Sequence, residues 1–419
     1  MKNEIKKYKF SDLYEMSSGL SSSKEQAGHG APFISFSTVF NNYFLPEIIK
    51  DKMNTSLDEQ LKFSVKKGDI LVTRTSETID ELAMSSVALC DYPQVTYSGF
   101  VKRLRPKKGN TVVYDKYIGF YLRSDLFRKT MTNNASMTTR ASFNEDIFSF
   151  LHLYLPSFET QKKVGDFLYK IEQKININNQ INDNLQQQLK LLYDYWFTQF
   201  DFPNQIGQPY KSSGGQMIVS NTLKTSIPSG WAIKNIREIS NITWGQCPEG
   251  KNILPLSAQG KDLLDYCSGA GDMKGGFLVD CQAKTNDSRR YAHNNDILVS
   301  VAGKIGDMCV VDHKISLGRA AMAFTAINEY EVPFIYMTLK SLNKKMLTIS
   351  SGSIQKVINN DNINDFNFAY NHDVVKEFSS ISTPIFTKLV KLSTENRELT
   401  KLRDWLIPML MNGQAKVLD

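Results

Sequence analysis

The stretch Phe158–Phe200, FETQKKVGDFLYKIEQKININNQINDNLQQQLKLLYDYWFTQF, has the pattern of one long polar helix. From Val164 onward, large apolar or Asn side chains recur at spacings that alternate between four and three residues, as on the a/d seam of a coiled coil. These seam positions are Leu168, Ile171, Ile175, Asn178, Asn182, Leu185, Leu189, Leu192 and Trp196. Such a helix, about 60 Å long at 1.5 Å per residue, exceeds most globular helices and is too polar to span a membrane.

A second copy of this helix closes the chain. One constant shift along the sequence places Val164 on Phe378, Ile171 on Ile385, Ile175 on Leu389, Asn182 on Asn396, Leu185 on Leu399 and Leu192 on Leu406. A single apolar stripe is usually one packed face of a globular protein, but two matched stripes predict that the helices pair with each other. Buried amides at Asn182 and Asn396 can then fix the register. Pro384 has no counterpart in the first helix and must either start the second helix at its N1 position or kink it.

The segments between the helices repeat as well. The matched strings are Leu13–Ser18 with Ile236–Asn241, Lys66–Val72 with Asn294–Val299, and the short helices Ile118–Ser124 with Ile335–Ser341. Each segment ends in an apolar stretch predicted as a strand, Ile147–Leu155 and Ile363–Ala369. The loops between these strings differ in length and content, so a shared frame carries divergent loops. We therefore expect an α+β protein with two tandem units that do the same job on two different targets.

Length and composition allow several ordinary cores. Of the 419 residues, 41 % are apolar and 22 % are charged, as in globular proteins, and the N-terminal sequence leads into no apolar run. Five cysteines without a Cys-x-x-Cys pair indicate free thiols in a reducing compartment. Residues 1–157 carry 21 basic and 17 acidic side chains and residues 202–372 carry 17 and 14, whereas the helices are close to neutral. This modest excess points to an acidic partner for the two globular segments.

Catalytic motifs are weak or missing. Gly245–Lys251 resembles a P-loop, but Asn252 replaces the Ser or Thr that binds Mg²⁺, and Pro255 interrupts the helix that should follow. Glu172-Gln173-Lys174 has a nuclease-like Glu-x-Lys form but lies within the long helix, where a solvated face is the simpler interpretation. The five histidines are scattered, and zinc, dinucleotide and adenosyl-methionine motifs are not found. We expect no catalysis, cofactor or metal in this chain.

Several strings, in order along the tandem frame, resemble the specificity subunit of type I restriction–modification enzymes over nearly the whole chain. They are Asn295–Val301 followed by Gly303–Gly306 and Leu317–Ala320, the Gly352-Ser353-x-Gln355 segment, Leu155-Pro156 leading to Glu159–Lys163, the connector ending Ile227–Trp231, and the terminus Leu399–Gly413. Each string alone is weak, but five in family order within a half-repeat form a specific signal. Departures are Pro384, and Ala135 where the second half has Gly352.

The resemblance implies two α/β target-recognition domains separated by two long antiparallel coiled-coil helices. We expect the domains at 1–157 and 231–372, the spacer helices at 158–201 and 373–419, and a connector at 202–230. In such a complex each domain reads one half of a split, asymmetric site in double-stranded DNA. The helices dock two adenine-N6 methyltransferase subunits, and restriction/translocase subunits complete the enzyme. S-adenosyl-methionine, ATP and Mg²⁺ would bind to those partner subunits and not to this chain. The resemblance also implies a prokaryotic cytoplasmic protein of host defence, without a membrane partner.

Long basic and amide side chains in loops are the expected DNA contacts, because Arg and Lys pair with guanine, Asn and Gln pair with adenine, and hydroxyls hold phosphates. In the first unit these candidates are Lys24, Arg74, Thr75, Ser76, Arg103, Thr138, Thr139 and Arg140. In the second they are Arg289, Arg290, Tyr291, Lys304, Arg319, Ser353, Gln355 and Lys356. The alternative interpretation of each candidate is a solvated surface residue without a DNA contact. For Arg319 a structural role in the shared frame is a further alternative.

A second function stays open at the level of sequence. A coiled-coil scaffold, such as an antirestriction-type relative, would bind the methyltransferase without reading DNA. Substituting Arg140 and Lys356 separates the two hypotheses, because a reader loses about 1–3 kcal/mol per base contact and a scaffold loses nothing.

Overall fold

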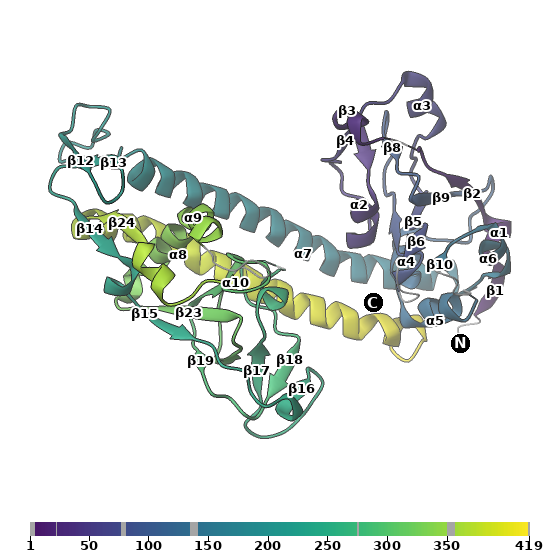
Figure 1. The fold of residues 1–419 in the computed structure, drawn as a ribbon. Coiled ribbons are helices and arrows are strands. Elements are labelled where there is room, and N and C mark those ends of the chain that lie inside the picture. Colours follow the sequence, from purple (N-terminus) through teal and green to yellow (C-terminus); the bar gives the residue numbers. More distant parts are fainter. Residues whose placement is uncertain are drawn as a thin grey trace. The chain divides into compact units, whose positions relative to one another are not determined.

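The computed structural model describes residues 5–21, 23–76, 81–134, 141–274, 276–349 and 357–417 (Figure 1). The chain forms two compact units. Unit 1 comprises Met1–Ile175 and Leu399–Asp419, and unit 2 comprises Asn176–Glu398. The division falls inside both long helices, so each unit is built from one globular segment together with a part of each helix.

The two long helices are α7, Phe158–Tyr193, and α10, His372–Met411. The Ser157 hydroxyl accepts the N–H of Thr160 at the start of α7, and the Asn371 side chain accepts the N–H groups of Asp373 and Val374 at the start of α10. The two caps stand at positions that the repeat makes equivalent. Helix α7 continues into a π-helical turn, η3, Asp194–Thr198. Pro384 lies inside α10 and does not start it.

Within each unit the two helices pack antiparallel. In unit 1, Arg403 Nη1 lies 2.7 Å from Glu172 Oε2. In unit 2, Asn178 Nδ2 donates to Asn396 Oδ1 at 2.8 Å, and Asn182 Nδ2 donates to Ser393 Oγ at 3.1 Å. As the residue numbers increase along α7, the numbers of the residues that they contact on α10 therefore decrease, as in an antiparallel pair.

The expected register pair of Asn182 with Asn396 is not formed. In an antiparallel pair, residues equivalent by the repeat lie on opposite sides of the centre of the pairing. Asn396 therefore bonds to Asn178 and Asn179, and Asn182 bonds to Ser393. The amides still lie in the interface, but each has a different partner.

The predicted seam residues lie on the inward faces of the helices. Those that are buried are Leu168, Ile171, Ile175, Asn178, Asn182, Leu189, Trp196, Leu389 and Asn396, and those that are half-buried are Leu185, Leu192, Ile385, Leu399 and Leu406. The helices thus contribute apolar rows to the core of each unit.

Each unit contains a four-stranded antiparallel sheet with the same strand order. In unit 1 the order is β2 (Tyr14–Ser18), β9 (Val101–Pro106), β5 (Ile70–Thr73), β7 (Ser85–Val87). In unit 2 it is β15 (Ser240–Trp244), β23 (Ala321–Ala326), β20 (Ile297–Ser300), β21 (Met308–Val310). A strand pair next to the long helices is also repeated, β1 (Lys6–Lys9) with β11 (His152–Leu155), and β14 (Ala232–Asn235) with β24 (Asn367–Tyr370). The half-repeat in the sequence is therefore a repeat in the fold.

A second, outer sheet covers the four-stranded sheet in each unit. In unit 1 its order is β4 (Lys52–Met53), β3 (Ala27–Ile34), β8 (Thr96–Tyr97). In unit 2 its order is β16 (Ile253–Pro255), β18 (Ala283–Thr285), β17 (Leu264–Cys267), β22 (Ile315–Leu317), β19 (Tyr291–Ala292). Strands β3 and β8, like β17 and β22, are parallel. The outer sheets are where the two units differ most in size.

Alternation along the central strand divides each core in two. Ile70 and Val72 of β5 face the core shared with the long helices, whereas Leu71 faces the outer sheet. Strand β20 of unit 2 repeats this division. Ile297 and Val299 face the core shared with the long helices, and Leu298 faces the outer sheet.

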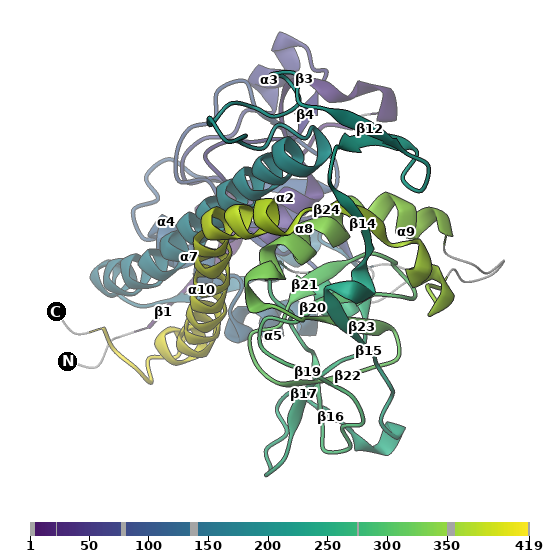
Figure 2. The same cartoon turned by 90° about the vertical axis from the view of Figure 1, so that its left-hand side faces the viewer.

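Two short helices follow the four-stranded sheet's strand β9 in unit 1 and β23 in unit 2. They are α4 (Asp115–Tyr121) and α5 (Asp125–Asn134) in unit 1, and α8 (Val332–Ser341) and α9 (Asn343–Ile349) in unit 2. Figure 2 shows α8 beside α10 with β20 and β21 beneath it, and the rings of Tyr336 and Phe386 lie 5.6 Å apart. The helices predicted at 118–124 and 335–341 are thus confirmed within a few residues.

Backbone details recur between the units. Asp69 and Asp296 each accept the backbone N–H three residues earlier, Lys66 and His293, in the turn before the central strand. The apolar stretch 147–155 was predicted wrongly as one strand, because its first part belongs to helix α6, Glu145–Phe150. The Asn144 side chain caps that helix by accepting the N–H of Ile147.

The stretch 363–369 likewise divides into a 3₁₀ turn, η8, Asp361–Asp365, and β24. In both units the strand that precedes the long helix is therefore only four residues long.

Candidate nucleic-acid interface

One exposed edge of unit 1 begins where β5 ends. The N–H of Arg74 donates to Phe100 O at 2.8 Å, and its carbonyl accepts the N–H of Phe143 at 2.7 Å, while its side chain is exposed. Thr75 and Ser76 form strand β6, which pairs with β10, Ala141–Ser142. Thr75 is half-buried and Ser76 is buried. The backbone is thus fixed by the ladder, and the arginine side chain is presented to solvent.

Two residues that the sequence did not single out lie beside Arg74. Lys102 Nζ donates to Ser18 Oγ at 2.7 Å, and partial burial followed by the charge of Arg74 lowers the pKa of Lys102. Phe100 is 63 % exposed, although aromatic rings of this size are normally buried. We call Arg74, Phe100 and Lys102 the unit 1 edge. Two cations and an exposed ring suit contact with phosphates and bases.

Arg103, the neighbour of Lys102, points the other way. Only 9 % of it is exposed, its Nη1 donates to Ser64 O, and its guanidinium lies 5.5 Å from the ring centre of Tyr97. Arg105, two residues on, bonds to the same carbonyl and pairs with Asp69 at 2.6 Å. Arg103 thus helps to join the outer sheet to the four-stranded sheet, away from the exposed edge.

Unit 2 repeats the backbone of this edge but not its side chains. The N–H of Val301 donates to Ala320 O and its carbonyl accepts the N–H of Ile358, which are the two bonds that Arg74 makes in unit 1. Ala320 is equivalent to Phe100, because its carbonyl accepts the N–H of Val301 as the carbonyl of Phe100 accepts the N–H of Arg74. Met322 pairs with Val299 of β20 as Lys102 pairs with Val72 of β5. Val301 and Met322 are buried and Ala320 is half-buried, so unit 2 lacks the cations and the exposed ring that unit 1 has at this place.

The sequence candidates of unit 2 are distributed around this edge and the outer sheet. Lys304 is exposed, follows the bridge of Ala302 with Val357, and pairs with Asp307 at 2.8 Å. Arg319 is exposed in the turn after β22. These two cations lie on turns whose backbones are held by strand pairing on either side.

Three more candidates of unit 2 lie at the start of β19 or just before it. Arg289 is held by Asp287 and Glu249, at 3.3 and 3.7 Å. The backbone N–H of Glu249 and the side chain of Arg289 lower the pKa of Asp287 to about 2. The carbonyl of Arg290 is bonded by the N–H of Leu317, and its side chain is exposed. The ring of Tyr291 lies 4.3 Å below the Lys314 ammonium.

Lys24 lies in unit 1 beside the outer sheet. It is exposed in the 3₁₀ turn η1, Lys24–Gln26, which a capping box between Ser23 and Gln26 stabilises. A groove of about 540 Å³ runs over strands β3 and β4 and is lined by Gly28, Lys50 and Lys52, among others. The groove lining thus holds two lysines together with the acidic Asp51.

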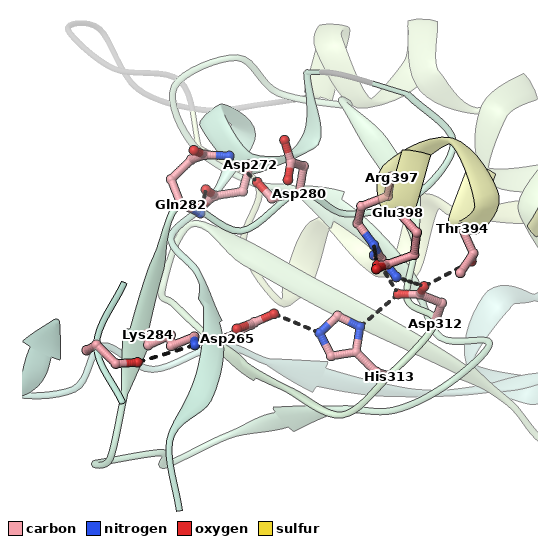
Figure 3. A network of polar contacts seen from close by, with 11 residues as sticks. Asp265, Asp272, Asp280, Gln282, Lys284, Asp312, His313, Thr394, Arg397 and Glu398 are labelled. Carbon is pink, nitrogen blue, oxygen red and sulfur yellow. Dashed lines mark hydrogen bonds and ion pairs between the residues drawn. The ribbon is translucent and has the colours of Figure 1, made fainter. Parts of the chain in front are cut away.

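A polar network joins the outer sheet of unit 2 to α10 (Figure 3). His313 lies between Asp265, at 3.0 Å from Nε2, and Asp312, at 2.8 Å from Nδ1. Asp312 also bonds to Arg397 and to the Thr394 hydroxyl on α10. The hydrogen bond to Asp265 and then that to Asp312 raise the pKa of His313 to about 9. Although burial opposes it, bonds from His313 and Arg397 hold the pKa of Asp312 well below its usual range.

Unit 1 is joined to the helices differently. The ring of Tyr43 lies between the guanidinium groups of Arg123 and Arg403, at 4.8 and 4.7 Å from its centre. Lys116 and the Tyr114 hydroxyl both bond to Asp166 of α7. The globular segment of each unit is thus fixed to its own part of the helix pair.

A family model described as a type I restriction modification DNA specificity domain matches residues 2–187 and again residues 228–370. The chain belongs to this family. The two matched ranges contain the two repeated sheet systems described above. This specificity subunit therefore carries the family domain twice, and the family function is recognition of a DNA target.

Relatives span nearly the whole specificity subunit. The chain is 22 % identical over 450 aligned positions to the "Type I restriction enzyme HindI specificity subunit" of Haemophilus influenzae, covering 91 % of this chain and 94 % of that protein. It is 21 % identical to the "Type I restriction enzyme MjaIX specificity subunit" of Methanocaldococcus jannaschii, covering 99 % and 94 %. The crystal structure of a type I S subunit from M. genitalium shares the fold with a TM-score of 0.57 at 16 % identity, covering 98 % and 96 %.

The specificity subunit brings only some of its sequence candidates together. Arg74, Thr75 and Ser76 share one edge, and Arg289, Arg290 and Tyr291 share one loop and strand. Lys24, Lys304 and Arg319 stand apart from these groups. Thr138, Thr139, Arg140, Ser353, Gln355 and Lys356, together with Ala135 and Gly352, lie outside the described residues.

Lys102 and Phe100 were missed, although the position of Lys102 carried a signal. Lys102 alternates with Arg103 along a strand, so one of the two had to face outward.

No group of three or more His, Cys, Asp or Glu side chains is placed to hold a metal ion within the described ranges. The amide of Gly245, in the P-loop-like string, donates to Ala321 O and is thus not available to a phosphate. No helix in the described part of the chain is long and apolar enough to cross a bilayer.

Proposed function

We propose that each unit of this specificity subunit reads one half of a split, asymmetric site in double-stranded DNA. Residues 1–157 and 231–372 would be the two target-recognition domains, and 158–201 and 373–419 the spacer helices on either side of the connector 202–230. The helices would dock two adenine methyltransferase subunits and, through the complex, the restriction/translocase subunits. The chain itself would catalyse nothing, and S-adenosyl-methionine, ATP and Mg²⁺ would bind to those partners.

One observation carries the proposal. The two units share strand order and backbone bonds, yet Arg74, Phe100 and Lys102 are replaced by Val301, Ala320 and Met322. Arg74 and Phe100 are exposed and Lys102 is half-buried, whereas Val301 and Met322 are buried. The repeated frame thus offers these contact groups in unit 1 and not in unit 2, which supports two different targets and not one palindromic target. The site candidates named from the sequence remain part of this proposal, with Lys102 and Phe100 added to them.

The test uses the complex that this chain forms in cells with the methyltransferase encoded by the neighbouring gene. Arg74→Ala/Lys102→Ala should relax or abolish recognition of one half-site and leave the other half-site unchanged, as read by modified-base sequencing. Lys107→Ala is the matched control, because Lys107 is an exposed lysine just after the other end of β9. Equal loss at both half-sites, or no change in either, would contradict the assignment of one reader to each unit.

A further inference from the structure

Unit 1 contains an apolar pocket of about 180 Å³ where α7 begins and α10 ends. Its apolar lining comes from Ile5, Pro156, Val164, Leu410, Met411 and Val417. Val164, Leu410 and Met411 are buried, whereas Ile5 is 50 % exposed and lies at the mouth. The pocket lining includes none of the candidate DNA contacts described above.

The half-repeat shows what fills the same place in unit 2. The shift that matches the two long helices takes Val164 to Phe378 and Met411 to Phe197, and the match of β1 with β14 takes Ile5 to Trp231. The ring of Phe197 lies 5.1 Å from that of Phe378 and 5.9 Å from that of Trp231. Three packed aromatic rings in unit 2 thus correspond to three aliphatic side chains in unit 1.

The correspondence holds in the backbone as well as in the sequence. At the end of α10 the N–H of Ala415 donates to Met409 O at 3.0 Å, and at the end of α7 the N–H of Asp201 donates to Tyr195 O at 2.9 Å. The sequence shift that matches the two long helices places Ala415 on Asp201 and Met409 on Tyr195, so the two hydrogen bonds are equivalent. The pocket is therefore the space that smaller side chains leave at a position built for rings.

In unit 2 a further segment adds aromatic rings to this place. Phe202 of the connector lies 4.8 Å from Tyr210 and 5.1 Å from Trp231, measured between ring centres. In unit 1 the repeat places Lys416 at the position of Phe202. Within the described residues of unit 1, no aromatic side chain lines the pocket.

We propose that this pocket, the unit 1 end pocket, receives an aromatic side chain from a partner protein chain. An apolar cavity of about 150 Å³ is known to take up benzene, so the volume suits one ring. Lys416 adds positive charge to the rim, where Lys163 is paired with Glu159 at 3.8 Å, and the charge of Lys416 favours acidic residues next to the ring on the partner segment. A second copy of this chain, with a formal charge of +7, meets that requirement less well. The inference rests on the docking of partner subunits proposed above and adds the place and chemistry of one contact.

Indole is the probe for the pocket in the purified full chain. At about ten times its Kd it should raise the Tm of the wild type by about 2–4 °C. Ile5→Trp restores the residue found in unit 2 and fills the pocket, so this variant should melt higher without indole and should not respond to it. Ile218→Trp is the matched control, because Ile218 is 44 % exposed on strand β12, Met217–Ser220, and it should respond like the wild type. An absent response in the wild type, or an equal response in Ile5→Trp, would overturn the proposal.

The partner is tested by crosslinking in cells that also produce the neighbouring subunits. A photoreactive benzoylphenylalanine in place of Lys416, which is exposed on the rim, should crosslink to a different protein chain next to an aromatic residue. A crosslink only to another copy of this chain, or none, contradicts the proposal. Ile5→Trp should also lower the extent of DNA methylation several-fold without changing the methylated motif. This readout is separate from DNA reading, whose failure would leave no motif even in the wild type.

Discussion

Arg403→Met tests how the two long helices are paired within unit 1. The guanidinium lies 2.7 Å from the carboxylate of Glu172, and only 12 % and 10 % of the two side chains are exposed. Removing the arginine leaves a carboxylate buried without its ion-pair partner, which costs about 3–5 kcal/mol. The guanidinium also packs on Tyr43, so lost packing adds to the cost. Because a domain is stable by only about 5–15 kcal/mol, this loss is large.

Urea unfolding followed by circular dichroism measures the effect on the purified chain. Glu172→Gln/Arg403→Met should recover much of the loss, because no charge then remains buried. Lys190→Met is the control, since Lys190 is 67 % exposed and its pair with Asp194 is worth at most about 0.5 kcal/mol. A cost for Arg403→Met as small as that of the control would refute the buried pairing of α7 with α10 in unit 1.

Three further outcomes are expected. Gly245→Ala should destabilise unit 2 by at least about 2 kcal/mol, because the new Cβ would lie 2.0 Å from Gly318 O, and calorimetry would show it. The raised pKa of His313 predicts stability that is fully present below its usual pKa and lost as pH rises through about 9. That loss should be about 1–2 kcal/mol after allowance for the 41 % exposure of the imidazole, and absent in His313→Gln. Lys102→Gln should reduce the salt dependence of DNA binding by about one counterion, and an unchanged slope in a filter-binding titration would place Lys102 away from phosphates.

The long helices and the half-repeat could be predicted from the sequence because they rest on periodic patterns. Spacings of three and four residues define an apolar face whatever the exact side chains are, and the shift that places Val164 on Phe378 compares two such faces directly. The pairing of individual residues could not be predicted in this way. A repeat shows which positions are equivalent, but in an antiparallel pair equivalent positions do not meet. Asn182 therefore bonds to Ser393, although Asn396 is its equivalent.

The candidate site was only partly predictable. Alternation along strand β9 shows that Lys102 and Arg103 face opposite sides, but the strand pattern does not show which side an outer sheet covers. The outer sheet brings Tyr97 against Arg103, so the arginine is buried, whereas the lysine on the other side is only half-buried. Phe100 was unpredictable for a similar reason, since a large ring is expected inside unless the turn that carries it is known.

The polar anchors to the helices depend on contacts distant in the sequence. Arg397 meets Asp312 across 85 residues, and Arg403 meets Glu172 across 231 residues. A single sequence carries no signal of such pairs, because charged residues on a polar helix are normally solvated.

Two readers on one chain are the central claim, and modified-base sequencing tests it most directly. DNA from cells that contain this chain and the neighbouring methyltransferase would be compared with DNA from cells that lack this chain. We predict methylated adenines on both strands of one split motif whose two halves differ, present only with this chain. A motif that is also present without the chain, or no discrete motif although the methyltransferase is bound to the chain, would contradict the account.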